Sequence, residues 1–212
     1  MNIDFETPMA ALLAHWQATC VIAFSADATE ASPALANVSD FTGLFAGLPV
    51  FGPGVVAGAT ILSLDEGAAA LTLSDPVDTA IVGGAFTAGF QTTGRRLLRW
   101  DEVSAQPALY LRRVGATDQY DHDSLFSITT LECEAWIYCN AGQNPDLAPD
   151  IGLTASERLL RQSLAYDDPG GDARFTIGGR VYWCRVEGKT DASPGDMGGQ
   201  AIARVPIRIT LP

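Results

Sequence analysis

One stretch of the sequence brings together side chains that could carry out chemistry. Residues 121–124 read Asp-His-Asp-Ser, and they offer the carboxylate, imidazole and hydroxyl groups of a hydrolytic triad or a metal site. Adjacent residues point in different directions on strands and loops, however, and the members of a triad converge from distant positions. We therefore interpret residues 121–124 as a polar turn. A hydrolase or metal-dependent enzyme stays open as the alternative to a protein that is not an enzyme.

Two other segments have the composition of ligand-binding loops. Asp191, Ser193 and Asp196 are spaced like the oxygen ligands of a calcium loop, but the order of an EF-hand and its closing Glu are missing. Residues 52–58 contain three glycines, yet their spacing differs from GxGxxG, and a strand pattern follows where a helix should receive the phosphate. We expect turns at both places, and no metal ion or cofactor.

The cysteines and the first histidine have no partner groups nearby in the sequence. Cys20, Cys133, Cys139 and Cys184 form neither a CxxC pair nor a Cys/His cluster at zinc spacing. Cys133 and Cys139 are six residues apart on one expected strand, so they share a face but lie too far apart to form a disulfide. We expect reduced thiols in the core, and a packing or surface role for His15.

Charge is distributed unevenly along the 212 residues. Residues 1–94 contain nine acidic residues and no Lys or Arg, whereas residues 95–212 hold all 13 basic residues beside 16 acidic ones. Phosphate groups are bound mainly by Lys and Arg. A net charge of −12 with one lysine, Lys189, therefore argues against a protein that binds nucleic acid tightly. It does not exclude DNA that passes by without being held.

The composition allows a sizeable core and contains no membrane-spanning run. Hydrophobic residues make up 47% of the chain, and no segment approaches the roughly 18 consecutive apolar residues that a spanning helix needs. Near the N-terminus Asp4 and Glu6 occur without any Lys or Arg, unlike a secretory signal. We expect a protein that is made in the cytoplasm and does not contact membranes.

The two ends of the chain have the patterns of an α+β protein. One helix is expected to begin with Thr7 as its N-cap, and another with a capping box of Thr154 and Glu157. Strands are expected at residues 108–112, 125–139, 175–187 and 201–211, the third of them broken at Gly178-Gly179. On two of these strands the outward positions carry aromatic and charged side chains, which suit a subunit interface: Glu132, Glu134, Trp136, Tyr138, Arg204 and Arg208.

Residues 24–90 differ from both ends. They are rich in Gly, Ala, Thr and Ser, and strand patterns at 59–65 and 69–75 flank a turn at residues 65–67. We therefore predict a small all-β domain at 24–90, inserted into a domain made of residues 1–23 and 91–212. Residues 47–76 resemble a β module that recurs in tail and fibre proteins of phages.

The order of elements in residues 1–23 and 91–212 resembles the tail terminator and minor tail proteins of long-tailed bacteriophages. The positions that carry the resemblance are Arg95, Arg96, Trp100, Gln106, Pro107, Ala108, Leu109, Gly178, Gly179, Val181, Gly188, Ile207 and Ile209. The resemblance implies an α+β fold in which helices flank a mixed β-sheet. It also implies no enzymatic activity, no cofactor, and assembly into a ring, typically a hexamer, on the tail tube.

These expectations together describe a structural virion protein. It would cap the tail tube and join it to the head-side connector, and its partners would be its own copies, the tail tube protein and the connector protein. DNA would pass through the lumen without specific binding. The protein would lie at the head-proximal end of the tail after assembly in the host cytoplasm. The alternatives are a neighbouring tail-completion or head–tail connector protein, and the enzyme considered above.

Overall fold

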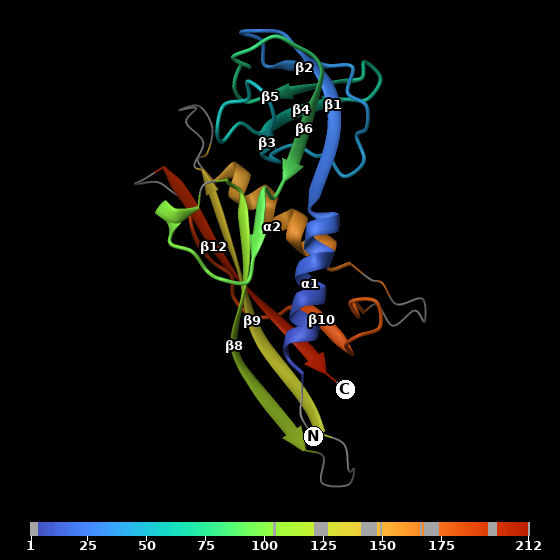
Figure 1. Cartoon of the computed structure of the whole chain (residues 1–212), viewed down its shortest axis with the longest axis vertical. Helices are drawn as coiled ribbons and strands as arrows, with labels where there is room; N and C mark the ends of the chain where they lie inside the picture. The colour runs from blue at the N-terminus through green and yellow to red at the C-terminus, as the bar shows by residue number, and fades with distance from the viewer. Residues whose placement is uncertain are drawn as a thin grey trace.

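The chain folds into a small β-barrel joined end to end with a larger body (Figure 1). This computed structural model describes residues 4–103, 105–120, 127–140, 148, 150–165, 167, 174–194 and 199–211. The described residues form two β-sheets and two α-helices, so the protein combines α and β structure and is mainly β. Neither helix in these ranges is long and apolar enough to cross a membrane.

The barrel is built from the first six strands of the described chain. These are β1 (Val21–Ala28), β2 (Ala34–Ala36), β3 (Val50–Phe51), β4 (Ile61–Asp65), β5 (Ala70–Leu73) and β6 (Ile81–Gly89), in the spatial order β3-β6-β1-β2-β5-β4. The two outer strands also meet, because Val50 N–H donates to the Ala59 carbonyl and Ile61 N–H to the Leu48 carbonyl. This closure removes most of the free sheet edge. The strands predicted at 59–65 and 69–75 are confirmed as β4 and β5.

The body contains a second sheet with one long central strand. Its strands are β7 (Thr92–Gly94), β8 (Ala108–Tyr120), β9 (Ser127–Asn140), β10 (Trp183–Val186), β11 (Asp191–Ser193) and β12 (Gln200–Leu211). Strand β9 pairs with β8 on one side and with β12 on the other along almost its whole length. Strands β10 and β11 pair with the two halves of β12, and β7 pairs in parallel with the start of β8. A 3₁₀ turn, η1 (Trp100–Glu102), lies between β7 and β8.

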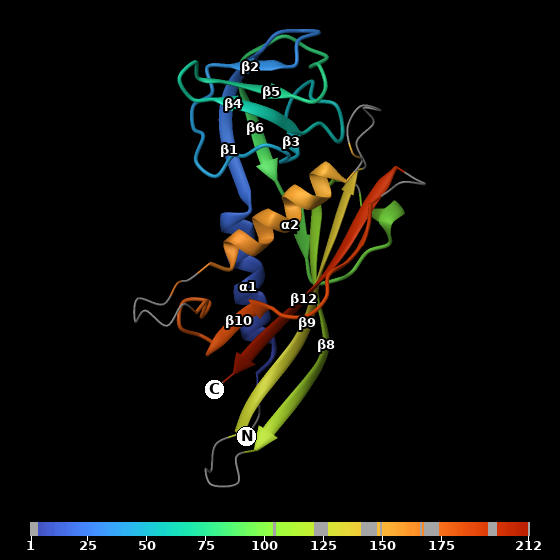
Figure 2. The same cartoon turned by 180° about the vertical axis from the view of Figure 1, so that it is seen from behind.

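Both helices cover the same face of this sheet (Figure 2). α1 (Glu6–Thr19) and α2 (Ile151–Ser163) share one hydrophobic core with the inward residues of the long strands. The alternation predicted for those strands is confirmed, since these residues are buried: Leu131, Cys133, Ala135, Ile137, Val205, Ile207, Ile209 and Leu211. Because the helices lie on one face, the expectation of helices that flank the sheet is met only loosely.

The helix starts differ from the predicted ones. α1 begins at Glu6, and the Asp4 carboxylate accepts the free N–H groups of Glu6 and Thr7 at 2.9 and 3.2 Å, so Thr7 is not the N-cap. α2 begins at Ile151, which places Thr154 inside the helix. The predicted capping box is therefore wrong, and Glu157 instead forms an i,i+4 ion pair with Arg161.

The strand predicted at residues 175–187 is broken at Gly178 and Gly179, as expected, and its extended part is shorter than the prediction. Ile177, Gly178 and Gly179 all have positive φ and form a turn, and only β10 is extended. The Asp167 carboxylate stabilises this turn by accepting N–H groups from Thr176 and Gly178 at 2.5 and 2.7 Å. Burial alone would raise the pKa of Asp167, but these hydrogen bonds outweigh it and lower the pKa below its ordinary value.

The barrel is connected to the body by two adjacent chain segments, residues 20–21 and 89–90, and their close approach is called the crossing. Val21 and Gly89 are cross-strand partners, and Phe90 N–H donates to the Cys20 carbonyl at 2.9 Å. The ends of the barrel are thus adjacent, as an insertion requires. The barrel nevertheless packs against α2. Gly47 of the barrel is so close to this helix that a Cβ built on it would lie 3.2 Å from the Ala155 side chain. Its core residues belong to the same hydrophobic cluster as those of the body.

Gly89 is the position at which this crossing tolerates no side chain. Its φ is +92°, and a Cβ would lie 2.3 Å from the Cys20 carbonyl oxygen. We expect Gly89→Ala to lower the free energy of unfolding by about 3 kcal/mol or more, since backbone strain and a steric clash add. Gly83→Ala is the matched control, because Gly83 also has positive φ but no atom within 4 Å of its Cβ. It should cost only about 1 kcal/mol in urea unfolding. Equal losses would contradict this account of the crossing.

Candidate assembly surface

The outer face of the body sheet, opposite the helices, carries a network of ion pairs. Arg204 on β12 contacts Glu134 of β9 at 3.3 Å and also binds Asp191 of β11. Arg208, four residues further along the same face of β12, binds Glu187 and lies 3.7 Å from Glu132. The network thus joins three neighbouring strands, because cross-strand pairing puts these side chains in adjacent rows.

This network already occupies the arginines that were predicted to meet a neighbour's carboxylates. Arg204 and Arg208 pair within their own chain, so a neighbouring molecule would have to share or exchange these contacts. Exposed ion pairs add little to stability, and such an exchange therefore costs little. The hydrogen bond from Arg204 lowers the pKa of Asp191 below its ordinary value, and the same contact raises the pKa of Arg204.

The two aromatic residues predicted for this surface differ in exposure. Trp136 is half-buried, and its Nε1 donates to Glu134 at 3.0 Å. Tyr138 is only 4% exposed, because Leu98 and its neighbours in the loop before β8 fold over it, and its hydroxyl donates to the Leu98 carbonyl at 3.1 Å. The expectation that Tyr138 lies on the solvent face is therefore wrong.

The distal half of the β8–β9 hairpin is exposed along most of β8. Strand β7 pairs only with Ala108–Tyr110 of β8, so the edge of β8 from residue 111 onward has no partner strand among the described residues. Val114 and Ile128 on this hairpin are 54% and 43% exposed. Figure 1 shows the hairpin extending away from the barrel, past the end of β12. The sequence prediction stopped this strand at residue 112, although the polar run that follows fits a strand exposed on both faces.

The exposed edge of β8 also carries positive charge. Arg112 makes no ion pair with any residue that the structure describes, and Arg113 lies 5.2 Å from the centre of the Phe5 ring. A β-bulge between Arg113 and Gly115 interrupts the pairing with β9 at this point. Bulges are frequent at sheet edges and twist them locally.

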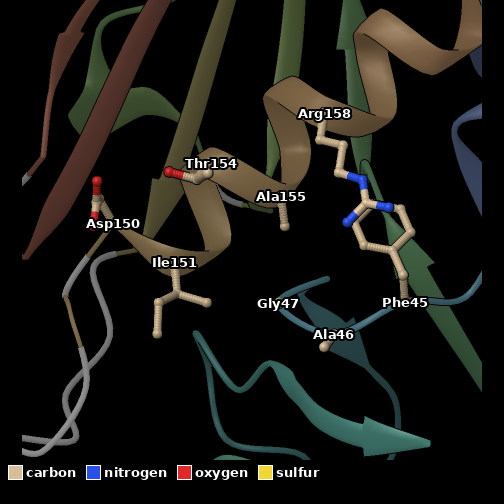
Figure 3. Close-up of a pocket in the computed structure, with 8 residues that line it drawn as sticks. All are labelled: Phe45, Ala46, Gly47, Asp150, Ile151, Thr154, Ala155 and Arg158. Carbon is tan, nitrogen blue, oxygen red and sulfur yellow. The ribbon is translucent and has the colours of Figure 1, made fainter.

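Open cavities of about 220 to 450 Å³ lie on the described part of the chain. The one in Figure 3 has a volume of about 230 Å³ and lies between the barrel loop at residues 45–47 and α2, where the Arg158 guanidinium stacks on the Phe45 ring at 4.4 Å. Another, of about 220 Å³, lies on the outer sheet face beside Val114, Glu187 and Arg208. Neither brings a nucleophile next to a base.

The chemical motifs considered in the sequence take up structural roles where they are described. Residues 52–58 form turns, with positive φ at Gly54 and Gly58. Asp191 and Ser193 lie on β11, whereas Asp196 and residues 121–124 lie outside the described residues. No group of three or more His, Cys, Asp or Glu side chains in the described ranges is placed to hold a metal ion.

His15 and the cysteines also pack structurally. His15 Nε2 donates to the Ser163 carbonyl at the end of α2 at 2.7 Å, and its ring lies 4.7 Å from that of Phe175. All four cysteines are buried and free, as expected. Burial raises the pKa of the Cys133 and Cys139 thiols to about 12, so both stay protonated and unreactive near neutral pH.

The Asp191–Arg204 contact gives a titration that can be measured. Because the pKa of Asp191 is depressed in the folded protein, the pair stabilises the fold above the ordinary value of 3.8, and this contribution disappears as pH falls through the folded pKa. We expect Arg204→Gln to return the Asp191 pKa towards 3.8 in an NMR carboxylate titration. Asp40, whose pKa is lowered by Thr42 N–H, should not change. An unchanged Asp191 would contradict the network.

Comparison with known proteins does not assign the chain to a family. A scan of protein-family models gives no match to the chain, and a search of curated proteins gives no similar sequence.

Proposed function

We propose that this protein is a structural component of a phage virion, which caps the tail tube as an oligomeric ring and joins it to the head-side connector. The chain follows the order of elements that the resemblance implies: helix α1, the β8–β9 hairpin, α2 and the closing strand β12. A neighbouring tail-completion or head–tail connector protein would share this kind of assembly and differ in its partners.

The observation that carries the proposal is the unprotected β8–β9 hairpin. A long strand with free backbone groups on one edge can pair with another chain, and exposed apolar side chains, here Val114 and Ile128, favour that association. Proteins that stay monomeric cover or shorten such edges, as the barrel does here by closing. The hairpin therefore fits a subunit that is completed by its neighbours.

The outer sheet face next to the hairpin has the residue types that interfaces favour. Trp136 is partly exposed there beside Arg204 and Arg208, and Trp and Arg are the residues most enriched among interface hot spots. Ion pairs at the rim can be shared between subunits without burying unpaired charge.

The barrel is suited to the outside of such a ring. It lies at the opposite end of the molecule from the hairpin (Figure 1), so it does not obstruct contacts made through the hairpin. Residues 24–90 contain seven acidic residues and no Lys or Arg. This charge favours a soluble, projecting domain over one that contacts DNA.

Sedimentation velocity of the purified chain tests the proposal. We expect a discrete species several times heavier than the 22.4 kDa chain, about six times if the ring is a hexamer. Trp136→Ala should shift this species towards the monomer, since an aromatic anchor is lost. Leu62→Ala is the matched control, because Leu62 is an exposed apolar residue on the barrel. A wild-type protein that stays monomeric at all concentrations would overturn the proposal.

The proposed lumen leads to a second prediction. DNA must slide through the end of the tail, and a Lys-rich lining would hold it by counterion release. With a net charge of −12, the purified protein should not retard duplex DNA at physiological salt in a gel-shift titration. Binding that weakens steeply as salt is raised would count against a neutral or acidic lumen.

A further inference from the structure

The free edge of β8 has backbone groups in position to accept another strand. The Pro107 carbonyl accepts Gln91 N–H on the β7 side, and backbone groups point to alternate edges along a strand. Leu111 and Arg113 therefore direct their N–H and C=O groups to the unpaired edge. The bulge inserts one residue, after which Ala116 and Asp118 take this orientation.

The opposite edge of the same sheet is also open. β11 pairs with β12 only, and the described residues show no backbone bond to its outer side. Four residues at this edge are exposed: Gly188, Lys189, Ala192 and Ser193. β10 is less available, because Cys184 N–H already donates to the Phe175 carbonyl.

The two edges match in direction and partly in height. Glu187 N–H donates to Pro206, which lies in the row of Arg112, whereas β11 lies level with the part of β8 that β7 covers. β8, β9, β12 and β11 are successively antiparallel, so β8 runs opposite to β11. A neighbour rotated about an axis along the strands would therefore present β11 antiparallel to β8, the more stable pairing. Asp191, Arg204, Trp136 and Tyr110 lie in one row across the sheet, only one residue from the start of the free edge at Leu111.

Charge at the two edges is complementary. Arg112 on the β8 edge has no ion-pair partner among the described residues. Glu187 and Asp191 flank the other edge, and their side chains remain 32% and 45% exposed within their present ion pairs. A carboxylate accepts more than one hydrogen bond, so either can also bind Arg112 of another copy.

We propose that the β8 edge at residues 111–118 of one copy pairs with residues 187–193 of a second copy, so that the body sheet continues from subunit to subunit. This inference rests on the proposed function, because a ring joins two different surfaces of each copy. The pairing satisfies the free backbone groups of β8. It also puts Arg112 beside the neighbour's Glu187 and Asp191.

Hydrogen exchange of the assembled wild-type protein tests this pairing. In an unpaired edge strand about half of the amides of residues 111–119 point to solvent and exchange quickly. We expect peptides covering 111–119 to retain nearly all their amide hydrogens in the assembled protein, together with those covering 187–193. An assembled protein in which the outward half still exchanges at the rate of an exposed loop would overturn the pairing and leave the proposed function standing. A protein that does not assemble would overturn both.

Two variants at one exposed position provide a second test. Ala116→Pro removes an outward N–H without touching the pairing with β9, whereas Ala116→Ser keeps it. We expect Ala116→Pro to shift sedimentation to the monomer while its circular dichroism stays that of the wild type, and Ala116→Ser to assemble normally. Normal assembly of a folded Ala116→Pro protein would overturn the pairing. If Ala116→Pro does not fold, the exchange experiment on the wild type decides.

Discussion

Pairing of β9 on both of its sides determines the layout of the body. Because β8 and β12 are hydrogen-bonded to β9 along almost its entire length, its register fixes which side chains face the helices. Leu131 and Ile137 are thereby buried under α1 and α2. Glu132 and Trp136 are necessarily directed to the other face. A shift of one residue would bury carboxylates and expose the core, so the ion-pair network outside and the hydrophobic core inside depend on the same ladder.

The attachment of the barrel depends on a second, local constraint. The chain leaves the body at Cys20 and returns at Gly89, and the crossing is so close that only glycine fits the return position. α1 ends at this point with Cys20 as its C-cap, and α2 contributes Leu159 to it. The barrel is thus formed by the chain segment between these two adjacent points, and its core is continuous with that of the body.

Patterns of period two and of composition predicted much of this architecture. The alternation in residues 201–211 gave the correct buried face, since only that face of β12 is covered. The glycine-rich segment was correctly read as strands and turns. Helix starts were not predictable from capping residues alone, because Asp4 and Thr7 are both good caps and the chain uses Asp4.

Contacts between distant segments escaped prediction for a different reason. Tyr138 has the pattern of an outward residue, and only the folding of residues 97–103 over the sheet buries it. The contact of Arg204 with Asp191 depends on the pairing of β11 with β12, which no local pattern encodes. The free edge of β8 follows from the shortness of β7, a property of topology rather than of composition.

A negative-stain image of the purified chain tests the central claim, that this protein acts by assembling around a channel. The account predicts particles of one size with a central opening, because cyclic contacts between two different edges of one sheet close into a ring. Compact particles with the dimensions of a single 22.4 kDa chain, at concentrations well above those needed for imaging, would contradict it.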